Sequence, residues 1–147
     1  MRGLKLIPDA GSKQSMLSQR CLRLLLIEDV DDIQTILRFS LGTLSGWQVF
    51  TAKSTQAWLP LAQDKLPDVI VVDGHPNTRE ILVQLKADAS TQKIPVVCLV
   101  SRDRTSDQLQ IQQDGAAAIV GKPFDPISLV QIILDIVELD SNDDVCL

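Results

Sequence analysis

The sequence has few of the residues that mark secreted, disulfide-bonded or zinc-binding proteins. Its three cysteines, Cys21, Cys98 and Cys146, are far apart, odd in number and form no CxxC pair. Together with the single histidine, His75, they match no familiar zinc-site spacing. This pattern indicates a reducing compartment, in which we expect Cys98 to be a small buried apolar residue.

Long apolar runs and an excess of positive charge are also missing. No segment approaches the roughly 18 apolar residues of a membrane span, and no apolar core of a signal peptide follows the basic N-terminal residues. The chain has 14 Lys and Arg against 19 Asp and Glu, a formal net charge of −5, which argues against a nucleic-acid surface and against binding to anionic membranes. We therefore expect a cytoplasmic protein with neither nucleic acid nor membrane among its partners.

The composition that remains is that of an ordinary globular domain. Hydrophobic residues make up 45% of the 147 residues and charged residues 22%. A chain of this length can bury one sizeable core without disulfides or metals. We expect a flexible arm over residues 1–20, one domain over residues 21–139 and an acidic tail over residues 140–147.

Short apolar runs alternate with segments of helical period in the predicted domain. We expect strands over residues 22–27, 47–52, 68–72, 95–100 and 117–120, with a helix after each, the first over residues 31–44 and the fourth over residues 105–113. Asn77 and Glu80 resemble a capping box at the start of the third helix. Five alternating β–α units predict an α/β fold, a doubly wound five-stranded parallel sheet with the strand order 2-1-3-4-5.

Acidic side chains close two neighbouring strands of this predicted sheet. Glu28 and Asp29 follow the first strand, and Asp73 follows the third. Because the carboxyl ends of adjacent parallel strands meet at one edge, these carboxylates should converge, and buried anions need a counter-charge. A hard cation such as Mg²⁺ prefers carboxylate oxygens and also binds phosphate oxygens. Lys122 ends the fifth strand, from which its ammonium group could reach a phosphoryl oxygen.

Four segments, in this order, resemble the receiver domains of response regulators, including the chemotaxis receivers. They are LLLIEDVDD, PDVIVVD, KADASTQKIPVVCLVS and DGAAAIVGKPFDPISL. The similarity extends from about Leu22 to Glu138, which is most of the chain. Each segment alone is a weak signal, whereas four in the right order and spacing identify a stand-alone, atypical member of this family.

The resemblance implies a flavodoxin- or receiver-like three-layer sandwich that takes part in two-component signalling. Asp73 would accept a phosphoryl group from a histidine kinase or phosphotransfer protein, and Lys122 would contact that group. Glu28, Asp29 and Asp73 would bind Mg²⁺. The phosphorylated form would bind a downstream protein target, so the chain would be a signalling protein and not an enzyme.

Two switch positions depart from the receiver pattern. Val100 stands five residues after the strand-four proline, where the family usually has Thr or Ser. Ser101 follows it, but one step along a strand reverses the face, so Ser101 could substitute only if the strand has already ended. Ile119 stands three residues before the strand-five lysine, where the family often has an aromatic residue.

The loop after Asp73 also differs from the family. Pro76 lies three residues after Asp73, instead of four, and the loop to the next helix is shorter by about three residues. In receivers this loop supplies a carbonyl ligand to the metal. His75 stands where family members tune the lifetime of the phosphoryl group.

Several functions remain open on these residues. The leading interpretation is a single-domain response regulator, since we expect no DNA-binding segment in the few residues after the last helix. The alternative is a degenerate receiver that acts as a phosphorylation-independent interaction or dimerisation module, with a homodimer formed through exposed apolar residues of the last two helices. A flavin-binding domain is disfavoured because EDVDD offers carboxylates instead of phosphate-cradling donors. A hydrolase is disfavoured because no nucleophile elbow is present.

Overall fold

A computed structural model describes residues 22–73, 77–101, 105–122 and 125–140 of the chain. Five parallel strands form one sheet in the order β2-β1-β3-β4-β5, which confirms the predicted fold class and strand order. The strands are β1 (Arg23–Glu28), β2 (Gln48–Ala52), β3 (Val69–Asp73), β4 (Val96–Ser101) and β5 (Ala118–Lys122). The expected N-terminal arm and nearly all of the expected acidic tail lie outside the described residues.

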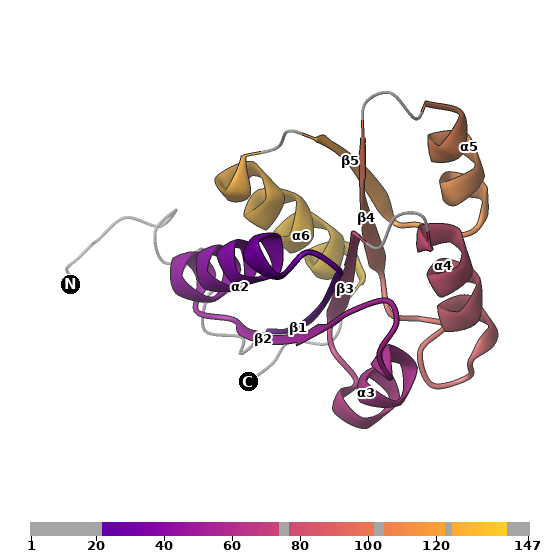
Figure 1. Ribbon diagram of the computed structural model, residues 1–147, viewed down its shortest axis with the longest axis horizontal. Coiled ribbons are helices and arrows are strands. Elements are labelled where there is room, and N and C mark those ends of the chain that lie inside the picture. The colour runs from indigo at the N-terminus through magenta and orange to yellow at the C-terminus, as the bar shows by residue number, and fades with distance from the viewer. Residues whose placement is uncertain (1–21, 74–76, 102–104, 123–124, 141–147) are drawn as a thin grey trace, which may run out of the picture.

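Within the residues that the structure describes, five helices cover the two faces of this sheet. They are α2 (Asp31–Ser45), α3 (Trp58–Lys65), α4 (Thr78–Ala87), α5 (Thr105–Gln113) and α6 (Pro126–Asp140). Helices α2 and α6 lie on one face, and α3, α4 and α5 lie on the other (Figure 1). Within the described ranges, no helix combines the length and the apolar character needed to cross a membrane.

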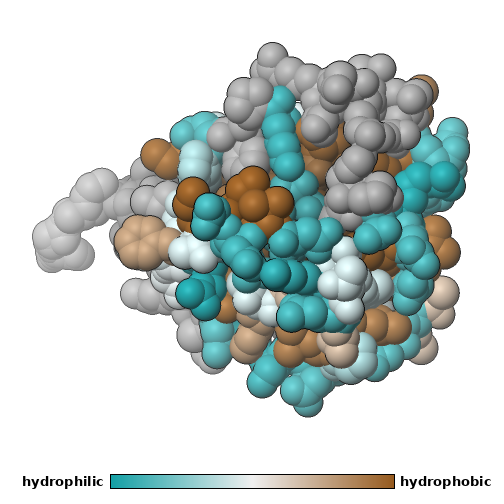
Figure 2. Space-filling view, in the orientation of Figure 1, coloured by the Kyte–Doolittle hydropathy of each residue, from teal (hydrophilic) through white to brown (hydrophobic). Residues whose placement is uncertain are grey.

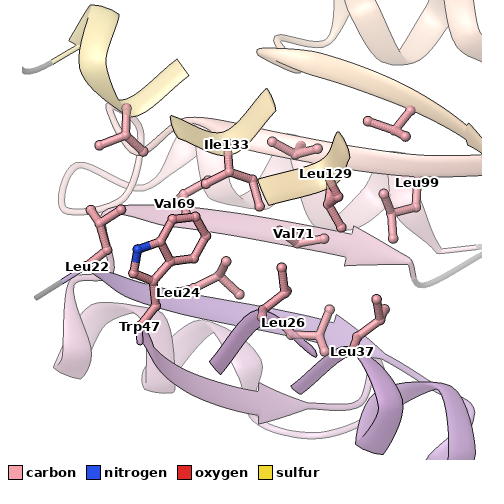
Figure 3. Packing of buried hydrophobic residues seen from close by; sticks show 14 residues of the cluster. Leu22, Leu24, Leu26, Leu37, Trp47, Val69, Val71, Leu99, Leu129 and Ile133 are labelled. Carbon is pink, nitrogen blue, oxygen red and sulfur yellow. The ribbon is translucent and has the colours of Figure 1, made fainter. Parts of the chain in front are cut away.

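Two buried clusters fill the spaces between the sheet and its helices, because the strands alternate their side chains between the two faces. Val69 and Val71 of β3 belong to the first cluster, beneath α2 and α6 (Figure 3). Ile70 and Val72 belong to the second cluster, beneath α3, α4 and α5. Burial on both faces explains why the strands read as continuous apolar runs in the sequence.

Cys98 in β4 has the buried position that the sequence predicts. Its side chain is fully buried in the second cluster and forms no disulfide. Burial raises the pKa of its thiol to about 12, with the nearby charge of Lys86 acting weakly in the opposite direction. Cys98 is therefore a packing residue and not a reactive thiolate at neutral pH.

Helix α2 buries a narrower stripe than its sequence predicts. Leu37 and Leu41 are buried against the sheet, whereas Ile33 and Ile36 are 37% and 60% exposed. In the sequence, Ile33 and Ile36 recur at helical spacing with Leu37 and Leu41 and suggest a wider apolar face, but both remain in contact with solvent. On the face of the molecule seen in Figure 2, apolar residues are interspersed with polar ones and do not form one continuous surface.

Two glycines of α2 should respond to alanine substitution with opposite signs. Gly46 ends the helix in the left-handed conformation, with φ at 73°, and its N–H bonds Gly42 O at 2.8 Å. Gly42 is inside the helix, where an added Cβ would meet only the Trp47 carbonyl at 3.7 Å. We expect Gly46→Ala to lower the free energy of unfolding by about 1 kcal/mol and Gly42→Ala to raise it by about 0.5–1 kcal/mol. Urea denaturation of both variants tests this; changes of the same sign would contradict it.

Candidate functional site

Asp73 and Lys122 form an ion pair at the carboxyl edge of the sheet. Asp73 ends β3 and its side chain is 3% exposed, whereas the Lys122 side chain, at the end of β5, is 33% exposed. Lys122 Nζ donates a hydrogen bond to Asp73 Oδ1 at 2.7 Å and lies 2.6 Å from Oδ2. The structure thus brings together two of the predicted site residues, 49 positions apart in the chain, and the Lys122 ammonium group offsets the charge of the buried carboxylate.

Glu28 lies beside Asp73 because the register of β1 and β3 pairs these two residues. Its side chain is buried. The carboxyl oxygen Oε2 accepts a hydrogen bond from Val30 N at 3.1 Å, whereas Oε1 has no hydrogen-bonding partner. Burial is the main reason that the pKa of Glu28 is raised to about 8, and the neighbouring Asp73 carboxylate raises it further. The Val30 N–H and the Lys122 charge oppose this shift. Burial and the neighbouring Asp73 carboxylate therefore favour the protonated form of Glu28.

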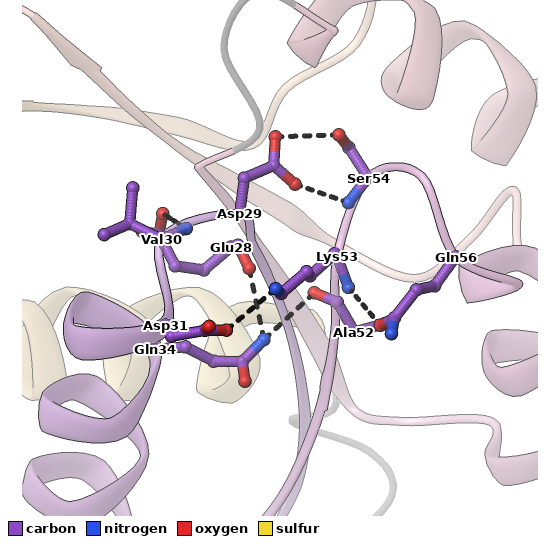
Figure 4. A network of polar contacts seen from close by, with 9 residues as sticks. All are labelled: Glu28, Asp29, Val30, Asp31, Gln34, Ala52, Lys53, Ser54 and Gln56. Atoms are coloured by element: carbon purple, nitrogen blue, oxygen red, sulfur yellow. Dashed lines mark hydrogen bonds and ion pairs between the residues drawn. The ribbon is translucent and has the colours of Figure 1, made fainter.

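Asp29 points toward the connection between β2 and α3 (Figure 4). Its Oδ1 accepts a hydrogen bond from Ser54 N at 2.6 Å, and its Oδ2 accepts one from Ser54 Oγ at 2.8 Å. Ser54 Oγ in turn accepts a hydrogen bond from Asn77 Nδ2 at 3.0 Å. Both oxygens of the Asp29 carboxylate are therefore engaged by one residue.

Asn77 occupies the N-cap position of α4 but does not form the predicted capping box. Its side chain makes no hydrogen bond to the first turn of the helix, because its amide donates to Ser54 Oγ instead. Its carbonyl still accepts the first helical hydrogen bond, from Ile81 N at 3.0 Å. The sequence correctly places the start of the helix but not the direction of this side chain.

The three predicted metal-binding carboxylates are not assembled into one group. Within the described ranges, no set of three or more His, Cys, Asp or Glu side chains is placed to hold an ion. Glu28 and Asp73 lie together as expected, whereas Asp29 is bonded to Ser54. Neither Ser54 nor Asn77 was predicted as a site residue, although both follow strand ends at the edge where the site was expected.

A second set of polar contacts joins the ends of β1 and β2 to α2 (Figure 4). Gln34 Nε2 donates to Glu28 O at 3.1 Å, and Lys53 Nζ forms an ion pair with Asp31 Oδ1 at 2.8 Å. Asp31 raises the pKa of Lys53 through this contact. These contacts fix the first turn of α2 next to the predicted site.

The two atypical switch positions are packed and apolar. Val100 is buried in the second cluster. Asp73 follows Val69 and Val71 at intervals of two residues in β3, so its side chain belongs to the opposite face of the sheet, where the first cluster lies. Ile119 is partly buried against the same second cluster. Strand β4 continues through Ser101, so it does not end before this residue. His75 and Pro76 lie outside the described residues.

Sequence comparisons match this chain to signalling proteins. The model of the response regulator receiver domain matches residues 24–134. Response regulator Rre1 of Synechocystis sp. is 33% identical over 120 residues, which cover 76% of this chain and 50% of Rre1. Transcriptional regulatory protein KdpE of Mycobacterium tuberculosis is 37% identical over 101 residues, which cover 68% of this chain and 44% of KdpE. The chain therefore spans half or less of the length of these curated relatives.

Solved structures share the fold. The receiver domain of sensor histidine kinase PA1611 from Pseudomonas aeruginosa, which has a magnesium ion coordinated in its active site cleft, matches with a TM-score of 0.70 and 21% identity over 79% of this chain and 97% of that one. Chemotaxis response regulator CheY4 of Vibrio cholerae matches with a TM-score of 0.68 and 20% identity over 78% and 98%. Since the receiver model covers most of the described chain and the sheet has the expected strand order, this chain belongs to the response regulator receiver domain family.

Proposed function

We propose that this receiver domain accepts a phosphoryl group on Asp73 from the phosphohistidine of a histidine kinase or phosphotransfer protein. The observation that carries the proposal is the buried Asp73 carboxylate, held by Lys122 at the carboxyl edge of the sheet. A carboxylate of this kind can act as a nucleophile, and the paired ammonium group can follow the charge onto the incoming phosphoryl oxygens. We place this exchange in the cytoplasm, as the composition predicts.

The transfer needs little from the protein beyond positioning and charge. One Asp73 oxygen forms a bond to phosphorus while the bond from phosphorus to the donor imidazole nitrogen breaks, and that nitrogen keeps the electron pair. Lys122 moves from the carboxylate toward the phosphoryl oxygens that now carry the negative charge. The chain acts here as acceptor and not as enzyme.

A magnesium site is supported in part by the side chains present. Glu28 is paired with Asp73 across β1 and β3, and its buried Oε1 has no hydrogen-bonding partner. A carboxyl oxygen in this position fits a metal ligand. Asp29 fits only after it turns away from Ser54. We propose that Glu28, Asp29 and Asp73 hold Mg²⁺, which when bound supplies positive charge for the transferring oxygens.

The test is phosphorylation of the purified protein with acetyl phosphate and Mg²⁺, read by intact mass. We expect the wild-type chain to gain one phosphoryl group and Asp73→Asn to gain none, because an amide oxygen is a poor nucleophile. The matched control is Asp68→Asn, next to the opposite end of the same strand, where the carboxylate accepts a hydrogen bond from Arg23 N. This variant should be modified like the wild type. A gain that persists in Asp73→Asn would contradict the assignment.

One alternative function has structural support. A degenerate receiver that binds partners without phosphorylation would have this fold without the phosphoryl transfer. Here Lys122 already offsets the charge of Asp73, and burial favours the neutral form of Glu28. If acetyl phosphate gives no modification and beryllofluoride with Mg²⁺ does not bind, this alternative is favoured. Analytical ultracentrifugation of the purified chain would then test whether it forms a homodimer.

Either function requires a surface for a protein partner. Helix α2 and the residue before it expose large apolar side chains at intervals of three residues: Val30, Ile33, Ile36 and Phe39. Val30 and Ile33 lie at the start of the helix, which follows directly on Asp29. Exposed apolar side chains gathered near a site commonly mark protein contacts. We propose that Val30 and Ile33 contribute to binding the phosphoryl donor or the downstream target.

A further inference from the structure

A chain of hydrogen bonds connects the segments that follow three strands of the sheet. Asn77 Nδ2, just before α4, donates to Ser54 Oγ at 3.0 Å, and Ser54 Oγ donates to Asp29 Oδ2 at 2.8 Å. The Ser54 backbone N–H donates to the other oxygen, Oδ1, at 2.6 Å. Asp29 follows β1, Ser54 follows β2, and Asn77 closes the segment after β3. These hydrogen bonds therefore link the proposed metal-binding residue Asp29 to the start of α4.

We propose that Ser54 holds Asp29 out of the metal-binding arrangement and thereby sets how tightly the site binds a divalent cation. The inference rests on the proposed magnesium site, because it concerns Asp29, the one proposed ligand that is not placed beside Glu28 and Asp73. In the described structure Glu28 and Asp73 are together, whereas Asp29 does not complete an ion-binding group with them. Ser54 is thus a positioning residue that acts through Asp29 and does not itself touch the cation.

The strength of the effect follows from the charge on Asp29. Hydrogen bonds from a hydroxyl to an ionised carboxylate are shorter and stronger than those between neutral groups. The donation from Asn77 polarises the Ser54 hydroxyl and strengthens its bond to Asp29. Magnesium demands near-ideal octahedral ligand geometry. If Asp29 must break two hydrogen bonds before it can take its place as a ligand, the free energy of breaking them lowers the affinity of the site for Mg²⁺. A cation can shift this equilibrium only by its preference for the released conformation.

The experiment measures cation affinity directly, by calorimetric titration of Mg²⁺ into the full chain, without any phosphoryl donor. We expect Ser54→Ala to bind Mg²⁺ about 3–10-fold more tightly than the wild type, because it loses the hydroxyl bond to Asp29. Ser54→Thr keeps the hydroxyl and should bind like the wild type. Asn77→Ala removes only the donor to Ser54 and should bind about twofold more tightly.

Ser90 provides a matched control elsewhere in the molecule. Its backbone N–H and hydroxyl also donate to one aspartate, although to a single oxygen: Ser90 N and Oγ lie 3.1 and 2.5 Å from Asp88 Oδ2, in the connection between α4 and β4. Ser90→Ala therefore loses the same kind of hydrogen bond away from the strand ends that carry the site. We expect its Mg²⁺ affinity to equal that of the wild type.

The outcomes separate the two proposals. If the wild type binds Mg²⁺ and Ser54→Ala binds it equally or more weakly, Ser54 does not restrain Asp29, and only this inference is overturned. If Ser54→Ala unfolds, the Asn77→Ala titration decides, and unchanged or weaker binding overturns the inference. If no variant binds Mg²⁺, the metal site itself is wrong and the inference fails with it.

Discussion

Lys122→Met is expected to lower the free energy of unfolding by about 2–3 kcal/mol at pH 7. The substitution keeps an unbranched side chain of nearly the same length but leaves the Asp73 carboxylate, 3% exposed, without its cation. Removing one partner of a buried ion pair is costly because the other charge stays desolvated. The cost is below that of a fully buried pair because the Lys122 side chain is one-third exposed. Urea denaturation at constant pH measures the difference.

A double-mutant cycle separates the charge from the loss of packing. Adding Asp73→Asn to Lys122→Met removes the buried charge, so we expect the double variant to be more stable than Lys122→Met alone. The control is Lys53→Met, which breaks a contact of similar length with Asp31, whose side chain is 77% exposed. This control should cost much less, because solvent screens an exposed pair. Equal costs for the two lysine variants would show that burial of Asp73 does not matter.

The fold was predictable because local patterns and the sheet architecture agree. Each expected strand ends within two residues of the observed one, since apolar runs such as DVIVV are bounded by polar or turn-forming residues. Helix α2 ends within one residue of its predicted end at residue 44, because Gly46 takes a positive φ there. The alternation of strands and helices then leaves few topologies, and the observed order is one of the two common ones.

The positions of the site residues were predictable, but their orientations were not. Strand register places Glu28 opposite Asp73, which follows from neighbouring parallel strands. The contact between Asp29 and Ser54 joins residues 25 positions apart through a loop, and no spacing rule specifies such a contact. Asn77 likewise turns from its expected cap toward Ser54. Short polar side chains choose among several nearby partners, and only the folded structure decides between them.

Glu28→Gln is expected to remove much of the pH dependence of stability between about pH 4.5 and pH 8. Burial and the adjacent Asp73 raise the pKa of Glu28 from 4.5 to about 8. Between these values the folded chain keeps the Glu28 proton and the unfolded chain has lost it, so the free energy of unfolding falls as the pH rises. The loss is at most about 1.4 kcal/mol for each pH unit. Glutamine imitates the protonated acid, because it is neutral and keeps a donor and an acceptor.

Urea denaturation at pH 5, 6.5, 8 and 9 measures this slope. We expect the wild type to lose stability over this range and Glu28→Gln to lose less, so that the variant is the more stable protein at pH 8. Glu80→Gln, on an exposed position of α4, is the matched control and should keep the wild-type slope. A Glu28→Gln slope equal to that of the wild type would show that Glu28 is not the group that titrates.

The same substitution should have the opposite effect on phosphoryl acceptance. A glutamine amide has no net charge with which to hold Mg²⁺, so we expect Glu28→Gln to gain much less phosphoryl group from acetyl phosphate than the wild type. If Glu28→Gln is more stable than the wild type at pH 8 and is no longer phosphorylated, Glu28 is needed for phosphoryl acceptance although it destabilises the folded chain. Its buried Oε1, which has no hydrogen-bonding partner, agrees with such a role. Lower stability at pH 8 would instead mean that Glu28 is ionised in the folded chain and that its charge supports the structure.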